Sequence, residues 1–126
     1  MGQLSPEGKG IAIQFLYEAS LINKEHPVVS LVGVRLRGAD VSDLELHDAN
    51  LSGTYLNGAN LSGSSLNDAN LSGSELVDAN LSGANLSGAE LSGANLSGAT
   101  GVSEEQLEEQ AKLLEGAIMP DGSKHP

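Results

Sequence analysis

A large apolar residue occurs at every fifth position of this chain from residue 31 to residue 96, without an insertion. These 14 positions hold Leu 13 times and Val once, at Val41. An α-helix repeats its buried face about every 3.6 residues and a strand about every two, so neither fits a period of five. The period predicts a repeat fold in which each five-residue unit forms the same short structure.

Each unit also has a small residue and a turn residue at fixed positions. Two positions before the apolar residue most units have Ala, Ser or Thr, and two positions after it ten units have Gly and four have Asp. The segment small-x-Leu is a short extended stretch with both apolar side chains on one side. The following x-Gly suits a type II turn, and Asp tolerates the positive φ of that turn better than most residues. Four units would then close a coil of 20 residues, and 14 units would make about three and a half coils.

The unit Ala-Asn-Leu-Ser-Gly, first seen in full at residues 49–53, resembles the pentapeptide-repeat family, whose pattern is Ala-(Asp/Asn)-Leu-x-x. Residues 29–99 carry the resemblance. It implies an all-β solenoid, a right-handed quadrilateral β-helix; the hand and the square section come from the family and not from the spacing. Stacking of residues 20 apart predicts a core that includes Leu31, Leu36, Leu51, Leu56, Leu71, Leu76, Leu91 and Leu96.

The sequence before the repeat predicts a helix that covers the first coil. Ser5-Pro6-Glu7 is a helix start, with an N-cap residue, Pro at the first helical position and an acid in the first turn. Apolar residues at helical spacing follow from Ile11 to Ile22, and Asn23 with Pro27 ends the pattern. We expect Phe15, the single Phe of the chain, to pack on the first coil.

The sequence after the repeat predicts a second helix. Ser103 and Gln106 have the spacing of a capping box, and Gly116 is a C-cap signal at the expected end of the helix. Residues 117–119 are expected to return as a short strand. We therefore expect an N-terminal helical cap and linker at 1–28, the solenoid at 29–100, and a C-terminal helical cap and tail at 101–126.

The flanking sequences carry a second resemblance, to bacterial pentapeptide-repeat proteins whose solenoid is a soluble module. Phe15-Leu16-Tyr17-Glu18-Ala19 and Met119-Pro120-Asp121-Gly122 carry it. Some of those proteins have membrane-spanning segments upstream, so this chain is expected to be cytoplasmic or the soluble module of a larger anchored protein. Residues 1–10 lack the basic start and apolar stretch of a secretory signal, and no apolar run reaches the length of a membrane span.

Reactive groups are not brought together by any spacing in the sequence. His26, His47 and His125 lie far apart, and the chain has no Cys. Ser is abundant but has no His placed as its base, and the Gly residues recur singly instead of forming a phosphate-binding loop. The six Asn-Leu-Ser sequences match a glycosylation pattern and are interpreted as by-products of the repeat. We expect no catalytic, cofactor-binding or metal-binding residues, no cofactor and no enzyme activity.

The charge is strongly acidic, with 17 acidic and 6 basic residues and a net charge of −11. That sign argues against direct binding of nucleic acid. The candidate interaction surface consists of Asp40, Asp43, Glu45, Asp48 and Asp68.

Three interpretations of this charge and of the repeat surface are open. The acids can serve solubility alone, or they can imitate duplex DNA, as the resemblance implies for relatives that protect DNA gyrase from quinolones. The third interpretation is ice binding, in which the regular Ser hydroxyls order water. The chain is shorter than those gyrase-binding relatives, its acids are more scattered, and a helix is expected to cover its C-terminal end. Our hypothesis is a monomeric, non-enzymatic scaffold or protein-interaction module whose partner is another protein. The alternative is an acidic DNA mimic that binds DNA gyrase or another nucleic-acid-binding protein.

Overall fold

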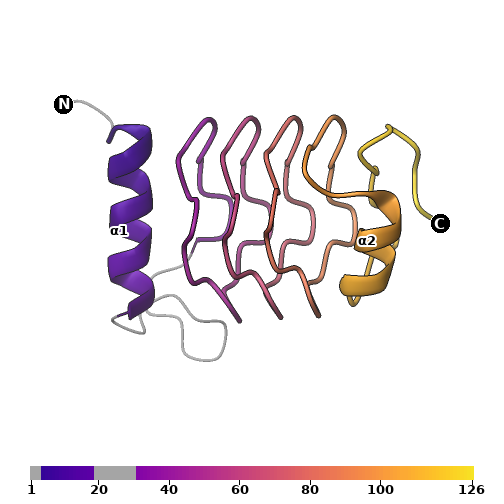
Figure 1. Cartoon of the computed structure of the whole chain (residues 1–126), viewed down its shortest axis with the longest axis horizontal. Helices are drawn as coiled ribbons and strands as arrows, with labels where there is room; N and C mark the ends of the chain where they lie inside the picture. Colours follow the sequence, from indigo (N-terminus) through magenta and orange to yellow (C-terminus); the bar gives the residue numbers. More distant parts are fainter. Residues whose placement is uncertain (1–3, 19–30) are drawn as a thin grey trace.

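The structure is a computed structural model that describes residues 4–18 and 31–126, with side chains described up to residue 14 in the first of these ranges. Helix α1 spans Pro6–Glu18 and helix α2 spans Glu104–Gln110. Between them the chain winds in stacked coils, with α1 at one end of the stack and α2 with the C-terminal tail at the other (Figure 1). Expectations that concern residues 19–30 and the side chain of Phe15 lie outside the described residues.

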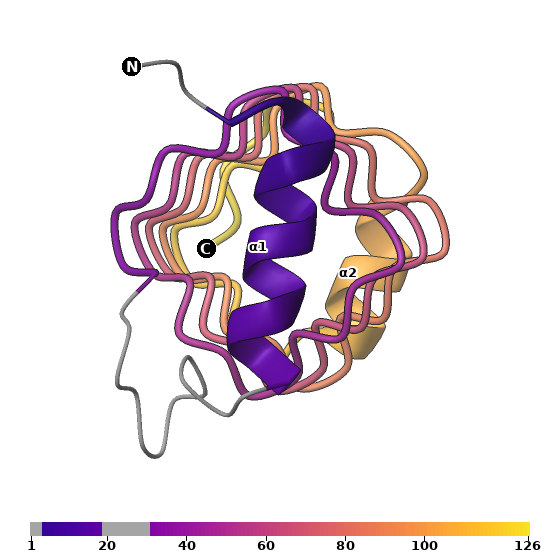
Figure 2. The same cartoon turned by 90° about the vertical axis from the view of Figure 1, so that its left-hand side faces the viewer.

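The coils form a β-helical solenoid with a period of 20 residues. Parallel bridges join residues 20 apart along four columns, which begin with the pairs Arg35–Tyr55, Asp40–Asn60, Glu45–Ser65 and Asn50–Asn70. Backbone hydrogen bonds run in both directions between coils; for example, Leu36 N–H donates to Tyr55 O at 2.7 Å. The end-on view shows the stacked coils with a four-sided outline (Figure 2).

The corners between bridging residues have the predicted chemistry. All 14 residues at the turn position, from Gly33 to Gly98, have positive φ, and the four Asp among them have φ between 56 and 64°. Thirteen of these 14 corners are closed by a hydrogen bond of the kind that Ala39 N–H donates to Leu36 O, at 3.0 Å. The residue before the Gly or Asp has negative φ, so the corners are type II turns. The prediction that Asp replaces Gly at these positions is confirmed.

The interior is built from the recurring Leu and from the small residue two positions earlier. The eight core Leu named from the sequence are 0–4% exposed. Thr54, Ser64 and Ser74 take the small position in three units and are also buried. Their hydroxyls donate to the carbonyls of Leu51, Leu61 and Leu71 at 2.6–2.8 Å, so the core contains no unpaired hydroxyl at these three positions.

Helix α1 begins as predicted and lies across the open end of the first coil (Figure 2). Ser5 Oγ accepts the N–H of Gly8 at 3.0 Å, as an N-cap does. Gly10 is buried at the closest approach, where an added Cβ would overlap with the carbonyl oxygen of Asp40. Ile13, 5% exposed, joins the core of the solenoid. A glycine is required at position 10 because the helix backbone rests directly on the backbone of the coil.

The second helix is shorter than the sequence predicted, and the expected C-cap at Gly116 is wrong. The capping box of Ser103 and Gln106 is present, but α2 ends at Gln110. The chain then rejoins the coils, with Leu113 paired to Glu90 and Ile118 paired to Asn95. Gly116, with φ of 75°, lies between these two bridging residues and has the conformation of a solenoid corner.

In place of the short strand expected at residues 117–119, the structure has isolated bridges at Ile118, which pairs with Asn95 and, in antiparallel sense, with Lys124. The tail thus covers the last partial coil: His125 N–H donates to Ala117 O at 2.7 Å and Gly116 N–H donates to His125 O at 3.0 Å. In the described part of the chain, neither helix has the length and apolar character needed to cross a bilayer.

Candidate interaction surface

The five acidic residues singled out from the sequence lie on the first two coils. Asp40 and Glu45 are bridging residues on successive sides of the first coil, and Asp43 and Asp48 are the corners that follow them. Asp68 lies one coil further along the same corner as Asp48, 20 residues later. Asp43, Glu45 and Asp68 are exposed and the other two are half-buried. Four of these acids thus follow two successive sides of the first coil, and the 20-residue period places Asp68 beside Asp48. We call the five side chains the acidic surface.

Two of the corner carboxylates lie close to the next coil. Asp43, with φ of 56°, places its side chain over the corner of the next coil, because a Cβ added at Gly63 would overlap with Asp43 Oδ1. The same relation holds between Asp68 and Gly88. The glycine beneath gives each of these two carboxylates room to lie against the next coil, whereas Asp68 itself follows Asp48 at their shared corner.

Asp40 also has a structural role. Its Oδ1 accepts the backbone N–H of Ser42 at 3.1 Å and the Ser42 hydroxyl at 2.5 Å. The hydroxyl bond, and then the backbone bond, lowers the pKa of Asp40 below its ordinary value. Asp40 is thus held as a carboxylate at the edge of the acidic surface.

The same arrangement explains the recurring Asn. In the units that begin at Asn50, Asn60 and Asn80, Oδ1 accepts both the N–H and the hydroxyl of the Ser two residues later. This bond satisfies a turn N–H that the ladder between coils does not use. The Asn-Leu-Ser sequences therefore have a structural reason within the repeat.

A second set of acids lies at the opposite end, on α2 and at Glu90 of the coil to which the returning segment pairs. Glu108 contacts His125 at 3.7 Å and Glu90 contacts Lys112 at 3.9 Å. Glu104 Oε1 accepts the N–H of Asp121 at 3.1 Å. These contacts hold the tail and the last partial coil in place, so three of the acids at this end take part in the fold.

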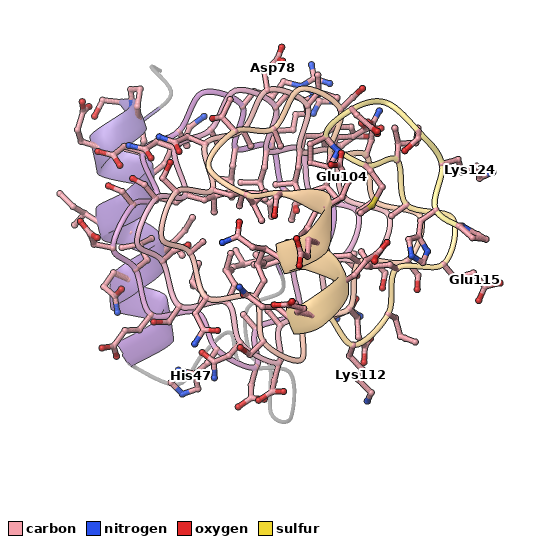
Figure 3. All side chains as sticks on the ribbon, turned by 45° about the vertical axis from the view of Figure 1, so that its right-hand side comes forward. His47, Asp78, Glu104, Lys112, Glu115 and Lys124 are labelled. Carbon is pink, nitrogen blue, oxygen red and sulfur yellow. The ribbon has the colours of Figure 1, made fainter. Side chains whose placement is uncertain are left out.

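Among the described residues, the His, Asp and Glu side chains form no cluster suited to a metal ion. His47 lies near the first coils, and Figure 3 shows it well away from Glu115 and Lys124, which point outward from the C-terminal end. His26 lies outside the described residues. Within the described residues, no group of three His, Asp or Glu side chains is placed to hold a metal ion.

Sequence reasoning missed two glutamines that complete hydrogen bonding on one column of the solenoid. That column contains Glu45 and Ser65 and continues to Asn85. At its N-terminal end Gln14 Oε1 accepts the N–H of Glu45 at 3.0 Å, and at its C-terminal end Gln110 Oε1 accepts the N–H of Leu86 at 3.1 Å. Each helix thus supplies a side-chain amide where a neighbouring coil would supply a backbone carbonyl. A Gln on each flanking helix was visible in the sequence, but its partner N–H is set by how the helix lies on the coil.

A β-helix with a 20-residue period and a Leu-lined interior defines a solenoid repeat protein. The family model for pentapeptide repeats matches residues 30–68 and 64–100, with 8 copies. These segments cover more than half of the chain, so the chain belongs to the pentapeptide-repeat family, as the resemblance predicted.

Solved structures of the same family are similar to this chain. The pentapeptide-repeat protein Rfr23 from the cyanobacterium Cyanothece 51142 is 40% identical over 66% of this chain and 51% of its own, with a TM-score of 0.52. The pentapeptide-repeat protein alr5209 from Nostoc PCC 7120 is 29% identical over 87% of this chain and 99% of its own, with a TM-score of 0.47. The match spans about half the length of Rfr23. A comparison with curated proteins gave no match.

Proposed function

We propose that this chain is a non-enzymatic scaffold that binds another protein through the acidic surface. The observation that carries the proposal is the gathering of Asp40, Asp43, Glu45, Asp48 and Asp68 on the first two coils, on a backbone fixed by ladders and type II turns. Members of the pentapeptide-repeat family generally serve as structural or interaction modules, which agrees with this role.

The negative charge of the acidic surface indicates which kind of protein would bind it. Carboxylates that project from a rigid frame attract a basic surface and speed its association through long-range electrostatics. The binding partner in our proposal is therefore a protein with a basic face. Nucleic-acid-binding proteins, DNA gyrase among them, have such faces. The alternative function, an acidic mimic of DNA that binds one of these proteins, therefore remains open.

In our proposal the chain folds as a right-handed quadrilateral β-helix of about three and a half coils. Residues 29–100 form the solenoid, and residues 1–28 and 101–126 cap its two ends. Support for caps comes from α1 lying across the first coil and from the tail pairing with Ile118. An open sheet edge invites pairing with another chain, and covered ends prevent it. We therefore expect a monomer, which light scattering after size exclusion measures directly.

The test is affinity capture with matched charge variants. Asp43→Asn, Glu45→Gln and Asp48→Asn together remove three charges from the acidic surface while keeping side-chain size, and Asn keeps the tolerance for positive φ at the two corners. The control variant is Glu105→Gln with Glu109→Gln and Glu115→Gln, which removes the same charge from exposed positions at the C-terminal end.

The expected result is a basic partner that binds the wild type and the control variant, is lost with the triple variant, and binds more weakly as salt rises. Purified DNA gyrase is tested in the same format. A partner that binds both triple variants equally well, or no partner at all, contradicts the proposal.

A further inference from the structure

The basic residues of this acidic chain are not spread evenly. The sequence has six, of which Lys24 lies outside the described residues. Three of the other five, Lys9 of α1 with Arg35 and Arg37 of the first coil, line one cavity of about 460 Å³ together with Leu4. We call it the basic cavity. Among the residues that the structure describes, no acid lines it, although the sequence has 17 acids.

The contacts within the protein do not explain why these cations are together. In the described part of the chain, Lys9, Arg35 and Arg37 form no ion pair with a carboxylate. Both arginines are exposed and flank the buried Leu36, so they project outward from the same side of the coil. Like charges that gather without a counter-charge repel one another, and an anion bound among them would relieve this repulsion.

One of the three cations is already oriented. The guanidinium of Arg37 lies 5.1 Å from the centre of the Tyr55 ring, a cation–π contact with the next coil. Arg35 is fixed at its backbone, because it bridges Tyr55 in the parallel ladder. Two arginines on a rigid coil and a lysine on a helix therefore face one cavity from two elements that pack on each other.

We propose that the basic cavity binds a small phosphorylated molecule. The planar fork of an arginine matches a phosphate group with two hydrogen bonds, and three cations suit a ligand with more than one negative charge. The cavity volume lies within the range of about 300–1,000 Å³ that is usual for small-molecule sites. Leu4 supplies apolar surface for the rest of such a ligand.

The surroundings limit the size of the ligand. Asp40 begins the acidic surface on the next side of the same coil, and the chain as a whole carries a net charge of −11. A duplex nucleic acid or an anionic membrane would extend from the cavity over these acids and be repelled. A small anion can use the three cations without approaching the carboxylates.

The test uses inorganic pyrophosphate as the probe, titrated into the whole chain and followed by two-dimensional amide NMR. Sodium chloride at equal ionic strength gives the reference for non-specific effects. We expect saturable shifts at the amides of Lys9, Arg35, Arg37 and Tyr55. Shifts of equal size near Lys112 and Lys124 would show unspecific attraction to any cation and would overturn the proposal.

The matched variants are Arg35→Gln with Arg37→Gln, and Lys112→Gln with Lys124→Gln as the control, each pair removing two positive charges from exposed positions. The arginine variant is expected to weaken pyrophosphate binding at least about tenfold and the lysine variant less than about twofold. An unchanged amide spectrum away from the substitutions shows that each variant is folded. Equal weakening in both variants, the absence of saturation in the wild type, or binding of anionic vesicles in place of pyrophosphate would refute a small-ligand site.

Discussion

Substitution of Leu71 in the middle of the stack tests the fold most directly. Leu71 is fully buried, and the period places Leu51 and Leu91 at the same position in the coils on either side. Its backbone N–H donates to Glu90 O at 2.7 Å, so the position is also held by the ladder. Leu71→Ala removes three carbons from this interior without disturbing any hydrogen bond.

The expected cost follows from burial and from the rigidity of the site. Loss of three buried carbons removes about 2.4 kcal/mol of transfer free energy, at about 0.8 kcal/mol per carbon. The cavity adds to this cost unless the neighbours collapse into it. Collapse is opposed here, because coil-to-coil hydrogen bonds hold the walls on all four sides. We expect a loss of about 4 kcal/mol in the free energy of unfolding, toward the upper part of the range for such substitutions.

The assay is urea unfolding followed by circular dichroism. The free energies of unfolding are compared with one common value for their dependence on urea concentration. Ser72→Ala is the matched control, since the Ser72 side chain points outward and its backbone N–H, which stays, makes the bond to Asn70 at 3.0 Å. The control should change stability by less than about 0.5 kcal/mol. Leu71→Asp, which buries an unpaired charge, should not fold. A cost below about 1 kcal/mol for Leu71→Ala, or equal costs for Leu71→Ala and Ser72→Ala, would refute the inward assignment of the repeated Leu.

Three further substitutions test the ends of the stack. Gly10→Ala should destabilise by about 1–3 kcal/mol through the clash with a carbonyl of the first coil, whereas helix propensity alone would stabilise by about 1 kcal/mol; thermal melts of this variant and of Gly8→Ala distinguish the two signs. Gln110→Ala should cost about 1–3 kcal/mol, because a backbone N–H loses its acceptor; exposed Glu109→Ala, which removes no such acceptor, should cost almost nothing in the same urea assay. Ser123→Ala should raise the pKa of Asp121, which the Ser123 hydroxyl holds below its ordinary value. Because that folded-state pKa is lowered, the stabilisation is present above the unfolded pKa and is lost as pH falls through the folded one; carboxyl NMR titration of both proteins checks the shift, and an unchanged pKa would contradict it.

The regular part of the fold was predictable because each requirement is local and repeats. A type II corner needs positive φ, so Gly or Asp at every fifth residue shows where the chain turns. The Asn side chain accepts a hydrogen bond from a backbone N–H of the same turn, as Asn50 Oδ1 does from Ser52. The known preference of Asn for such turns could have predicted this bond.

The C-terminal segment was harder because two local signals compete there. Ala111 and Leu114 continue a helical pattern, but Leu114, Gly116 and Ala117 also restore the order of the repeat. The coil prevails because Gln110 O accepts the N–H of Gly88 and Leu113 O accepts the N–H of Leu91, which extends the ladder over the exposed coil. The sequence signal for this was the Leu114-x-Gly116 spacing, which is displaced by the inserted helix from the register that ends at Leu96.

The sites themselves were predictable only where the period alone determines them. A period of 20 places Asp48 beside Asp68, so the acidic surface could be assembled from the sequence. The basic cavity could not be assembled from the sequence, because Lys9 and Arg35 line the same cavity only through the way α1 lies on the first coil. No local pattern encodes that placement, which depends on the fit of Gly10 against the backbone.

Departures from the repeated unit gather in the first coil, and this distribution bears on function. From residue 51 onward the outward positions are mostly Asn and Ser, whose side chains complete the turns. In residues 31–50 the same positions hold Arg35, Arg37, Asp40, Glu45 and His47. Stacking explains the Leu, the small residues and the corners of every coil alike, so it gives no reason for these charges. In a solenoid each coil contacts only its neighbours, and the coil nearest one end can change its outer side chains without altering the rest of the stack. The first coil is therefore where this fold can carry recognition at the least cost in stability, and both proposed sites lie on it or beside it.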